Sequence, residues 1–417
     1  MISCDLEQPK IETMTETRSR LRVYDDTRAL FHLPSGVTYL DGNSLGALPL
    51  GVAERVGRVI NVEWGDELIR AWNSAGWYVQ PRKVGDRIGR LIGAEPGSVI
   101  MGDTLSLKVY QALAAALDMS PQRRVVLSDD GNFPTDLYMA EGLIATLGRG
   151  HELRLVVPEQ VEASLSEEVA VLYLTEVDYR TGRRHDMARL TAKARALDIL
   201  TVWDLAHSAG ALPVDLAGVG ADFAAGCTYK YLNGGPGAPA FLYVAPRHAD
   251  RARAALSGWM GHARPFAFDL GYAPAGGVER MRVGTPAVLA LAALEASLDI
   301  WDRVDLDEVR ARSLALADRL IEEIERRCPV LKLVTPRAHE ARGSQVSFVF
   351  EGGYAAMQAL IARGVIGDFR APDIMRFGIT PLYIGEADIV RAAEVIEEVI
   401  RDAVWRRPEY QVVNAVT

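Results

Sequence analysis

The strongest constraint on the fold of this 417-residue chain is a series of short apolar runs between residues 85 and 245. Several of these runs lack the alternation of apolar and polar residues that a half-exposed strand shows. Strands that are apolar throughout are buried on both faces, as in a parallel sheet. Helical spacing separates the runs, for example over residues 186–197, which open with an acidic residue. The expected strands are Ser98–Met101, Arg124–Leu127, Leu153–Val157, Val169–Leu174, Leu200–Asp204, Asp222–Gly226 and Ala240–Val244.

This alternation predicts an α/β fold with a mostly parallel, doubly wound sheet in a large domain and a smaller C-terminal α/β domain. We expect an N-terminal segment (1–50) associated with the small domain, a large domain (51–290) and a small domain (291–417). No polar linker separates them, so the long helical stretch after residue 286 is expected to join the two domains. Strand-like Lys332–Val334, Gln345–Phe350 and Met375–Gly378 fall in the smaller one.

The composition excludes several classes of protein. A chain that is 49% hydrophobic and 24% charged is typical of soluble globular proteins. A net charge of -9 argues against binding to nucleic acid or to an anionic membrane surface. The three cysteines are far apart and lack C-x-x-C spacing, so no disulfide framework and no metal site is predicted. The N-terminus carries no secretory signal pattern and no apolar stretch is long enough for a membrane helix, so we expect a cytoplasmic protein.

One of the six lysines, Lys230, stands in the Gly-rich segment C-T-Y-K-Y-L-N-G-G-P-G. A lysine presented from such a turn can form a Schiff base with the aldehyde of pyridoxal phosphate. Asp204, at the end of an expected strand in W-D-L-A-H-S-A-G, could keep the pyridine nitrogen protonated, and His207 could support the ring. Alone, these residues also fit a helix cap, a packed histidine and a surface lysine. Their combination favours a pyridoxal-phosphate site.

The segment G-D-T-L-S-L-K at 102–108 follows an expected strand and begins a helical stretch. Free N–H groups at a helix N-terminus suit a phosphate group. Leu105 and Ser106 are the expected contacts, and Thr104 is a further candidate. A capping threonine or serine explains the same residues equally well.

The segment N-F-P-T-D at 132–136 also lies between an expected strand and a helix. Phe133 could stack on the cofactor ring, Asp136 could lie near its nitrogen, and Pro134 and Thr135 would line the same turn. A turn with a helix N-cap accounts for the segment as well.

Seven motifs together identify a resemblance to the kynureninase family of fold-type-I pyridoxal-phosphate enzymes, over residues 40 to 385. The lysine and aspartate motifs indicate only the superfamily, whereas D-G-N-S-L-G, G-W-M-G-H and R-F-G-I-T-P-L-Y are closer to diagnostic. In chain order the motifs are L-D-G-N-S-L-G (40–46), N-F-P-T-D, W-D-L-A-H-S-A-G, T-Y-K-Y-L-N-G-G-P-G, G-W-M-G-H (258–262), R-V-G-T-P (282–286) and R-F-G-I-T-P-L-Y (376–383).

The resemblance implies a role for each matched position. Lys230 would form the Schiff base, and Asp204 and Asp136 would be the acids near the pyridine nitrogen. Tyr229 would hold the phosphate and relay a proton, and Thr175 would complete the pocket. The neighbouring subunit of a homodimer would supply two phosphate contacts. The implied cofactor residues are Leu105, Ser106, Phe133, Pro134, Thr135, Asp136, Thr175, Asp204, His207, Tyr229, Lys230 and, from the neighbouring subunit, Trp259 and Thr285.

The substrate residues that the resemblance implies are fewer. Arg376 would clamp the substrate α-carboxylate with its planar fork. Ser44, with Gly42, would line the substrate entrance, and Trp64 would face the aryl group. A Gly-Asn-Ser turn and a buried tryptophan explain these last residues equally well. His262 in G-W-M-G-H is interpreted as structural.

The implied reaction is hydrolysis of L-kynurenine, or its 3-hydroxy form, to anthranilate, or 3-hydroxyanthranilate, and L-alanine in tryptophan catabolism. Schiff-base chemistry follows from the residues, but cleavage of the bond beyond Cβ follows from the resemblance alone. A cysteine desulfurase would need a nucleophilic cysteine, and Cys227 and Cys328 both look buried or structural. An aminotransferase or epimerase of the same fold stays open. A catalytically silent cofactor-binding regulator would normally carry an added DNA-binding domain.

Overall fold

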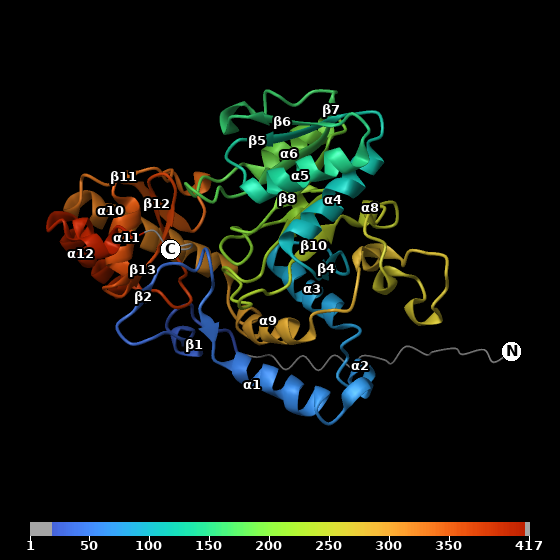
Figure 1. Ribbon diagram of the computed structural model, residues 1–417, viewed down its shortest axis with the longest axis horizontal. Helices are drawn as coiled ribbons and strands as arrows, with labels where there is room; N and C mark the ends of the chain where they lie inside the picture. Colours follow the sequence, from blue (N-terminus) through green and yellow to red (C-terminus); the bar gives the residue numbers. More distant parts are fainter. Residues whose placement is uncertain (1–18, 413–417) are drawn as a thin grey trace.

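A seven-stranded sheet forms the centre of the larger of two lobes in the computed structural model, which describes residues 19–412 (Figure 1). The strand order is β4-β10-β9-β8-β7-β5-β6. Strands β5 to β9 pair in parallel, and β10 is antiparallel to both β9 and β4. All seven expected strands are confirmed, with ends shifted by at most two residues. Their bounds are β4 Val99–Met101, β5 Val125–Asp129, β6 Glu152–Val156, β7 Val169–Thr175, β8 Leu200–Asp204, β9 Phe223–Gly226 and β10 Phe241–Val244.

Helices cover both faces of this sheet because consecutive strand residues point to opposite sides. On β7, Val171 and Tyr173 pack into a cluster with helix α4, whereas Leu172 and Leu174 pack into a second cluster with α3 and α6. Asp186 begins α6 by accepting a hydrogen bond from the Arg189 amide (3.0 Å), as its acidic position predicted. The helices are α3 Gln80–Leu91, α4 Leu105–Met119, α5 Pro134–Leu147, α6 Met187–Ala196, α7 Leu216–Val219 and α8 Pro246–Ala249.

The smaller lobe has a four-stranded antiparallel sheet in the order β11-β12-β15-β14. The N-terminal segment joins this lobe, because β2 (Thr38–Tyr39) pairs in parallel with β13 (Val365–Ile366). A short pair, β1 (Phe31–His32) with β3 (Leu48–Pro49), closes the same segment. The remaining elements are β11 Lys332–Leu333, β12 Gln345–Val349, β14 Asp368–Arg370, β15 Ile374–Gly378, α10 Leu306–Arg327, α11 Gly353–Ile361 and α12 Glu386–Arg401.

The expectation of one long helix between the domains is wrong, because the region contains two helices. Helix α9 (Val288–Trp301) packs against α1 (Gly51–Arg58) and α3 of the larger lobe, and α10 packs against α12 of the smaller one. Between them, the Asp305 carboxylate caps α10 by accepting from the amides of Asp307 (2.8 Å) and Glu308 (3.4 Å). The turn at residues 302–305 therefore carries the chain from one lobe to the other.

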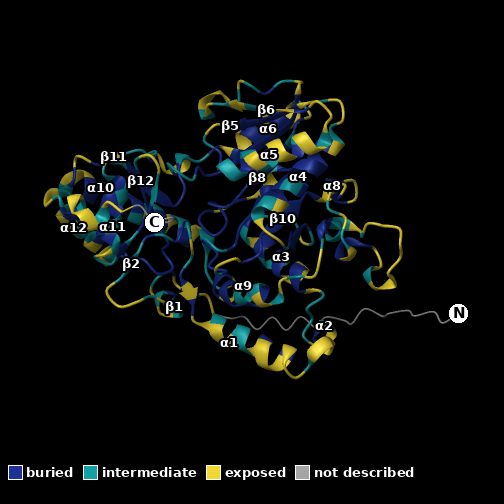
Figure 2. Cartoon of the chain, in the orientation of Figure 1, coloured by how far each residue is buried: buried dark blue, intermediate teal, exposed yellow. Residues whose placement is uncertain are grey.

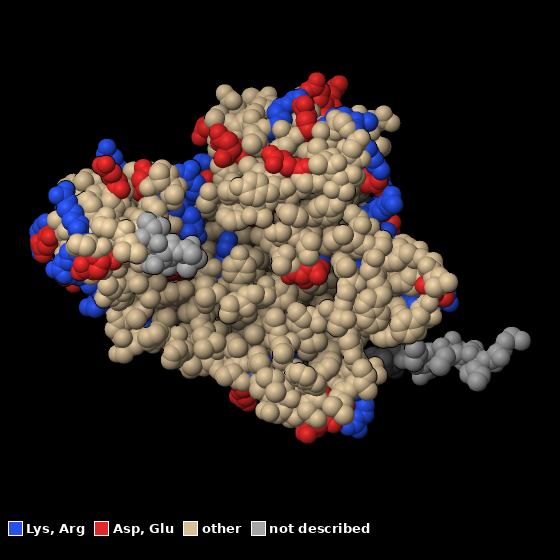
Figure 3. Space-filling view, in the orientation of Figure 1, with Lys and Arg blue, Asp and Glu red and all other residues tan. Residues whose placement is uncertain are grey.

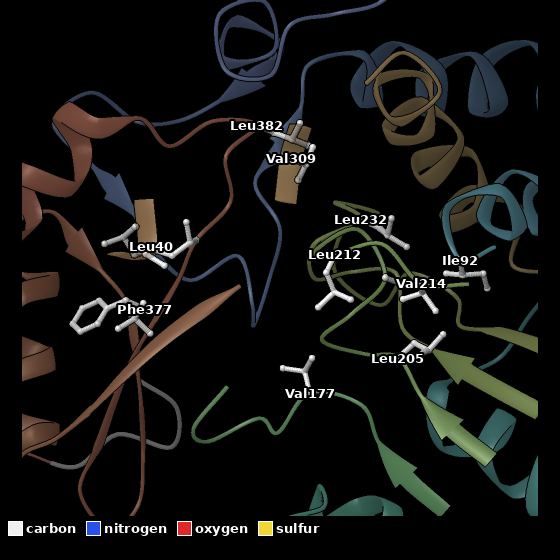
Figure 4. Packing of buried hydrophobic residues seen from close by; sticks show 14 of the residues in the cluster. Leu40, Ile92, Val177, Leu205, Leu212, Val214, Leu232, Val309, Phe377 and Leu382 are labelled. Carbon is white, nitrogen blue, oxygen red and sulfur yellow. The ribbon is translucent and has the colours of Figure 1, made fainter. Parts of the chain in front are cut away.

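The apolar core is continuous between the lobes. Figure 4 shows Leu205, Leu212 and Leu232 of the larger lobe on one side and Val309 and Leu382 on the other, all within one cluster. In Figure 2 the central strands of the larger sheet are buried, while α1 and α2 (Ala71–Ser74) are largely exposed. A π-helical turn, Val59–Trp64, follows α1. Within residues 19–412, no helix combines the length and the apolarity needed to cross a membrane.

Two glycines of α3 give a matched test of how this helix sits against β4. A Cβ at Gly85 would lie 2.3 Å from the Val99 carbonyl oxygen, but one at Gly89 would meet only side chains, those of Val99 at 3.5 Å and Ala94 at 3.8 Å. We expect Gly85→Ala to destabilise the protein by about 1–3 kcal/mol through overpacking. Gly89→Ala should be neutral or stabilising by up to about 1 kcal/mol, since alanine favours helix. Thermal unfolding monitored by circular dichroism checks the order, and equal midpoints for the two variants would contradict it.

Candidate active site

Lys230 lies in the turn after β9, where the strands of the larger sheet have their carboxyl ends. Its Nζ is 3.0 Å from Nε2 of His207, a residue that follows β8 and is only 4% exposed. Burial, with the charges of Lys230, Arg376 and Arg370, lowers the pKa of His207 well below its ordinary value. The imidazole is therefore neutral and accepts a hydrogen bond from the lysine ammonium.

Two buried carboxyl groups, Asp204 at the end of β8 and Asp136 in the first turn of α5, face each other across Thr175. The Thr175 Oγ1 is 3.3 Å from an oxygen of each, and the Ala206 amide donates to Asp204 (2.7 Å). Burial raises the pKa of both carboxyls, and the charge of Asp204 raises that of Asp136 further. Within the described residues neither forms an ion pair, and the basic group acting on Asp204 is Lys230. Such a pair suits a protonated ring nitrogen.

Asn132 fixes the aromatic side of this site. Its Oδ1 accepts from Thr175 Oγ1 (2.5 Å) and the Phe133 amide (2.7 Å), and its Nδ2 donates to Ser128 (3.0 Å). Phe133, 39% exposed, precedes α5 and meets the Tyr179 ring edge-on at 5.1 Å. Asn132 was quoted in the sequence motif without a role, and its position between a strand and a helix is the signal for it.

Pro134 and Thr135 form the first turn of α5, beside Asp136, and both are partly buried. The N-cap interpretation of the segment also holds in part, because Phe133 is the N-cap residue but its side chain makes no capping bond.

The start of α4 offers donors for an anion, as expected for Leu105 and Ser106. They begin the helix, whose first N–H groups have no intrahelical acceptor, and both are partly buried. Thr104 is instead the N-cap, accepting from the Leu107 amide at 3.4 Å. Sequence reasoning missed Lys108, which is fully buried and contacts Asp103 Oδ2 (3.2 Å) and the Met281 carbonyl (3.2 Å). Lys108 thus ties the start of α4 to the segment that leads to residue 285.

Tyr229 lies next to Lys230, whose Nζ is 5.8 Å from the centre of the phenol ring. The neighbouring Cys227 and burial raise the pKa of Tyr229, so its hydroxyl keeps its proton at neutral pH. The phenol can therefore donate a hydrogen bond or a proton at this side of the site.

Arg376 on β15 is buried and brought together with Ser44, as predicted. Its Nη2 is 3.0 Å from Ser44 Oγ. However, the edge of its guanidinium formed by Nε and Nη2 is already paired with Asp368 of β14, with Nε 2.5 Å from Oδ1. A second arginine, Arg370, also contacts Asp368 (2.9 Å). Asp41 belongs to this cluster, because burial and the charge of Asp368 raise its pKa to about 7.

Three expected residues are not brought to this site in the single chain. Trp64 is 58% exposed, Trp259 is 38% exposed and contacts Phe266 edge-on, and Thr285 is exposed. His262 accepts from the Arg264 amide (2.9 Å) and its Nε2 lies 3.1 Å from the Gly271 carbonyl, a structural arrangement.

Gly42 is enclosed rather than open. A Cβ there would lie 2.5 Å from both the Thr380 side chain and the Tyr383 hydroxyl, so close packing explains this glycine.

One site is thus lined by an amine, two carboxyls that form no ion pair among the described residues, an aromatic ring and a helix N-terminus. These groups match the aldehyde, the ring nitrogen, the ring face and the phosphate of pyridoxal phosphate. The donor set in the structure fits the cofactor that the sequence predicted.

Comparison with solved structures gives the fold. A cysteine desulfurase from Thermococcus onnurineus NA1 matches with a TM-score of 0.79 at 18% identity, covering 92% of this chain and 100% of that chain. A C-DES variant with glycine covalently linked to its PLP cofactor matches with a TM-score of 0.77 at 19% identity, covering 89% and 99%. The expected fold-type-I architecture is confirmed.

Comparison with sequences gives the family. The model of the kynureninase C-terminal domain matches residues 309–396. Kynureninase of Burkholderia pseudomallei (strain 1106a) is 50% identical over 397 residues, which are 94% of this chain and 95% of that protein. Kynureninase of Pseudomonas fluorescens is 49% identical over the same shares. With this identity over nearly the whole length, and with the lysine, carboxyl pair and arginine in one site, the chain belongs to the kynureninase family.

Proposed function

We propose that the protein uses pyridoxal phosphate to hydrolyse L-kynurenine, or its 3-hydroxy form, to anthranilate, or 3-hydroxyanthranilate, and L-alanine. Membership of the kynureninase family supports the reaction. The observation that carries the site is the Lys230 amine, 3.0 Å from a neutral His207 and close to the buried Asp204–Asp136 pair.

Four elements of the larger lobe would hold the cofactor. The Lys230 amine would bond its aldehyde, Asp204 and Asp136 would face its ring nitrogen, and Phe133 would cover the ring. The amides at the start of α4 would bind its phosphate. When bound, the cofactor supplies an electron sink for bonds to the substrate carbons.

The side chains around that position divide the remaining work. Lys230, once released by the substrate amine, can take the proton from Cα, and His207 orients the amine through Nε2. The Tyr229 hydroxyl, which keeps its proton, can return a proton to the substrate. Arg376 and Ser44 orient the substrate carboxylate at the smaller lobe. The Asp136–Asp204 pair is almost fully buried, so its carboxyls would meet the ring nitrogen with little access for water.

We further propose a homodimer in which Trp259 and Thr285 complete the phosphate site of the neighbouring subunit. Both are exposed in the single chain, next to many other exposed apolar residues. Figure 3 shows that the face around α1 and α9 is mostly uncharged, which is unusual for a free surface of this extent. Exposed apolar residues flank α1 (Leu48, Leu50, Ile60, Val62 and Ile69) and lie in the loop after Trp259 (Phe266, Phe268 and Leu270). The cytoplasmic location stays a prediction.

The cysteine desulfurase alternative lacks a suitable nucleophile among the described residues. Cys328 follows α10, is 2% exposed, and burial raises its pKa to about 11. Cys227 is 3% exposed, and burial raises its pKa as well. A thiol that keeps its proton is a poor attacking group. The likeness to desulfurases therefore concerns the fold.

Activity is tested with both kynurenine and 3-hydroxykynurenine, following the fluorescence of the anthranilate product. Lys230→Ala should lower turnover by a factor on the order of a thousand or more, because the covalent amine is lost. Lys332→Ala, in an exposed strand, is the matched control and should keep full activity. Borohydride treatment of the loaded enzyme should label position 230. A label on another lysine, or an active Lys230→Ala variant, would overturn the assignment.

Shared sites are tested by mixing two inactive variants. A heterodimer of Trp259→Ala and Lys230→Ala chains has one site with an intact lysine and an intact Trp259 from the other chain. We therefore expect about half of the wild-type activity per dimer, on the symmetry of two equivalent sites. Activity is measured on heterodimers purified with two different tags. Heterodimers no more active than the Trp259→Ala homodimer would show that each chain builds its site alone.

The pH dependence of substrate binding tests the cluster around Asp41. Because its pKa is raised to about 7, Asp41 is neutral below that pH and negative above it. The new charge would oppose a bound carboxylate, so KM for kynurenine should rise roughly threefold to tenfold between about pH 6 and 8. Asp41→Asn should remove most of this rise, and Asp118→Asn, on the surface, should leave it unchanged. A rise that persists in Asp41→Asn would assign it to another group.

A further inference from the structure

Arg376 has little free hydrogen-bonding capacity for a substrate. A guanidinium carries five N–H donors. Two of them face Asp368, one faces the carbonyl of Tyr179, and one faces Ser44. The side chain is also only 1% exposed. A carboxylate that reached this arginine alone would compete with a carboxylate already in place.

Arg370 stands beside Arg376 because of the strand register. Asp368 is directly opposite Arg376 in the antiparallel β14–β15 pair, and Arg370 is two residues further along β14. Residues two apart on a strand share a face, so Asp368, Arg370 and Arg376 project from the same side of the sheet. Arg370 Nη2 lies 2.9 Å from Asp368 Oδ2, and its side chain is 35% exposed. Of the two arginines, Arg370 is the one that a ligand can reach.

The charges of this cluster do not balance. Asp368 is a single carboxylate shared by two guanidinium groups. Despite its burial, the hydrogen bonds and charge of Arg376 lower the pKa of Asp368, so it is ionised. Asp41 is mostly neutral below pH 7. One positive charge is therefore left over for an incoming anion.

This unbalanced charge lies near His207, the residue that contacts the catalytic lysine. Arg370 lies close enough to His207 for its charge to lower the pKa of that imidazole, and His207 contacts Lys230. The charge of Arg370 also acts on the hydroxyl of Tyr179. The ring of Tyr179 contacts Phe133, and its carbonyl accepts a hydrogen bond from Arg376. An amino acid with its amine at Lys230 would thus present its carboxylate toward both arginines.

We propose that Arg370 is a second carboxylate-binding residue, which contacts the α-carboxylate of the amino-acid substrate together with Arg376. Asp368 is then a positioning residue that holds both guanidinium groups on one face of the β14–β15 hairpin. Arg370 contributes the charge that Asp368 does not neutralise, and Arg376 contributes the fixed geometry. This inference rests on the proposed function for the identity of the substrate, but not for its carboxylate.

The test compares ligands with and without a carboxylate. In Arg370→Ala we expect KM for kynurenine to rise about tenfold to a hundredfold with kcat changed less than about threefold, as for loss of a charged hydrogen bond. The inhibition constant of L-alanine should rise by a similar factor. Inhibition by the kynurenine analogue with hydrogen in place of the carboxylate should not change. Arg370→Lys should recover part of the loss, because it restores charge but not the planar fork.

Arg363→Ala is the matched control, since Arg363 is an arginine of the smaller lobe paired with Glu398, away from this cluster. It should leave all three ligands unaffected. Unchanged constants for kynurenine and L-alanine in Arg370→Ala would overturn the proposal, and so would equal weakening of ligands with and without a carboxylate, which marks a merely structural role. If the wild-type protein does not cleave kynurenine, the proposed function fails, but calorimetric binding of L-alanine to wild type and Arg370→Ala still decides the role of Arg370.

Discussion

Two carboxyl groups buried side by side, without an ion-pair partner among the described residues, set the conditions for the rest of the site. An oxygen of each of Asp136 and Asp204 lies 3.3 Å from Thr175 Oγ1, and burial raises the pKa of both carboxyls. Placing two such groups together costs free energy unless a cation compensates them. The sheet meets this cost by holding β7 and β8 in register, with Thr175 beside Asp204. A ring nitrogen that carries a proton would remove the cost, so the fold and the cofactor are energetically linked.

The smaller lobe has a charge imbalance of the opposite sign. There two arginines share one ionised carboxylate, so the imbalance is positive. The carboxyl pair lies near Lys230, and the two arginines lie near His207. The positive imbalance would match the carboxylate of an α-amino acid, whereas the carboxyl pair would match the ring nitrogen of the cofactor.

Much of the fold could be predicted from the sequence because its signals are local. The seven apolar runs form strands in the structure. A strand buried on both faces needs apolar residues at nearly every position, so its sequence is recognisable. Asp186 and Thr104 marked helix starts through a single side-chain bond each. The break between α9 and α10 was missed, although Asp305 stands at it as an N-cap, because the helical spacing resumes on either side. The motifs also named Lys230, Asp204, Asp136 and His207 correctly as neighbours.

The contacts that could not be predicted from the sequence depend on pairing between segments far apart in the chain. Ser44 meets Asp368 across 324 residues, and only the antiparallel register of β14 and β15 places Arg370 beside them. In the sequence, Lys108 cannot be distinguished from an ordinary helical lysine, because its contact with the Met281 carbonyl joins residues far apart in the chain. No local pattern carries such information, because it arises when the sheet of the smaller lobe closes on the N-terminal segment.

That N-terminal segment also connects the two lobes through main-chain hydrogen bonds. The Leu40 carbonyl accepts from Gly378 and the Leu40 amide donates to Ile366, both in the smaller lobe. Six residues later, the Gly46 amide donates to the carbonyl of Tyr229, directly beside Lys230. Any swing of the smaller lobe must therefore either pull on the lysine turn or be absorbed by bending within residues 41–45. The stretch D-G-N-S-L is thus the short main-chain link between the sheet of the smaller lobe and the lysine turn.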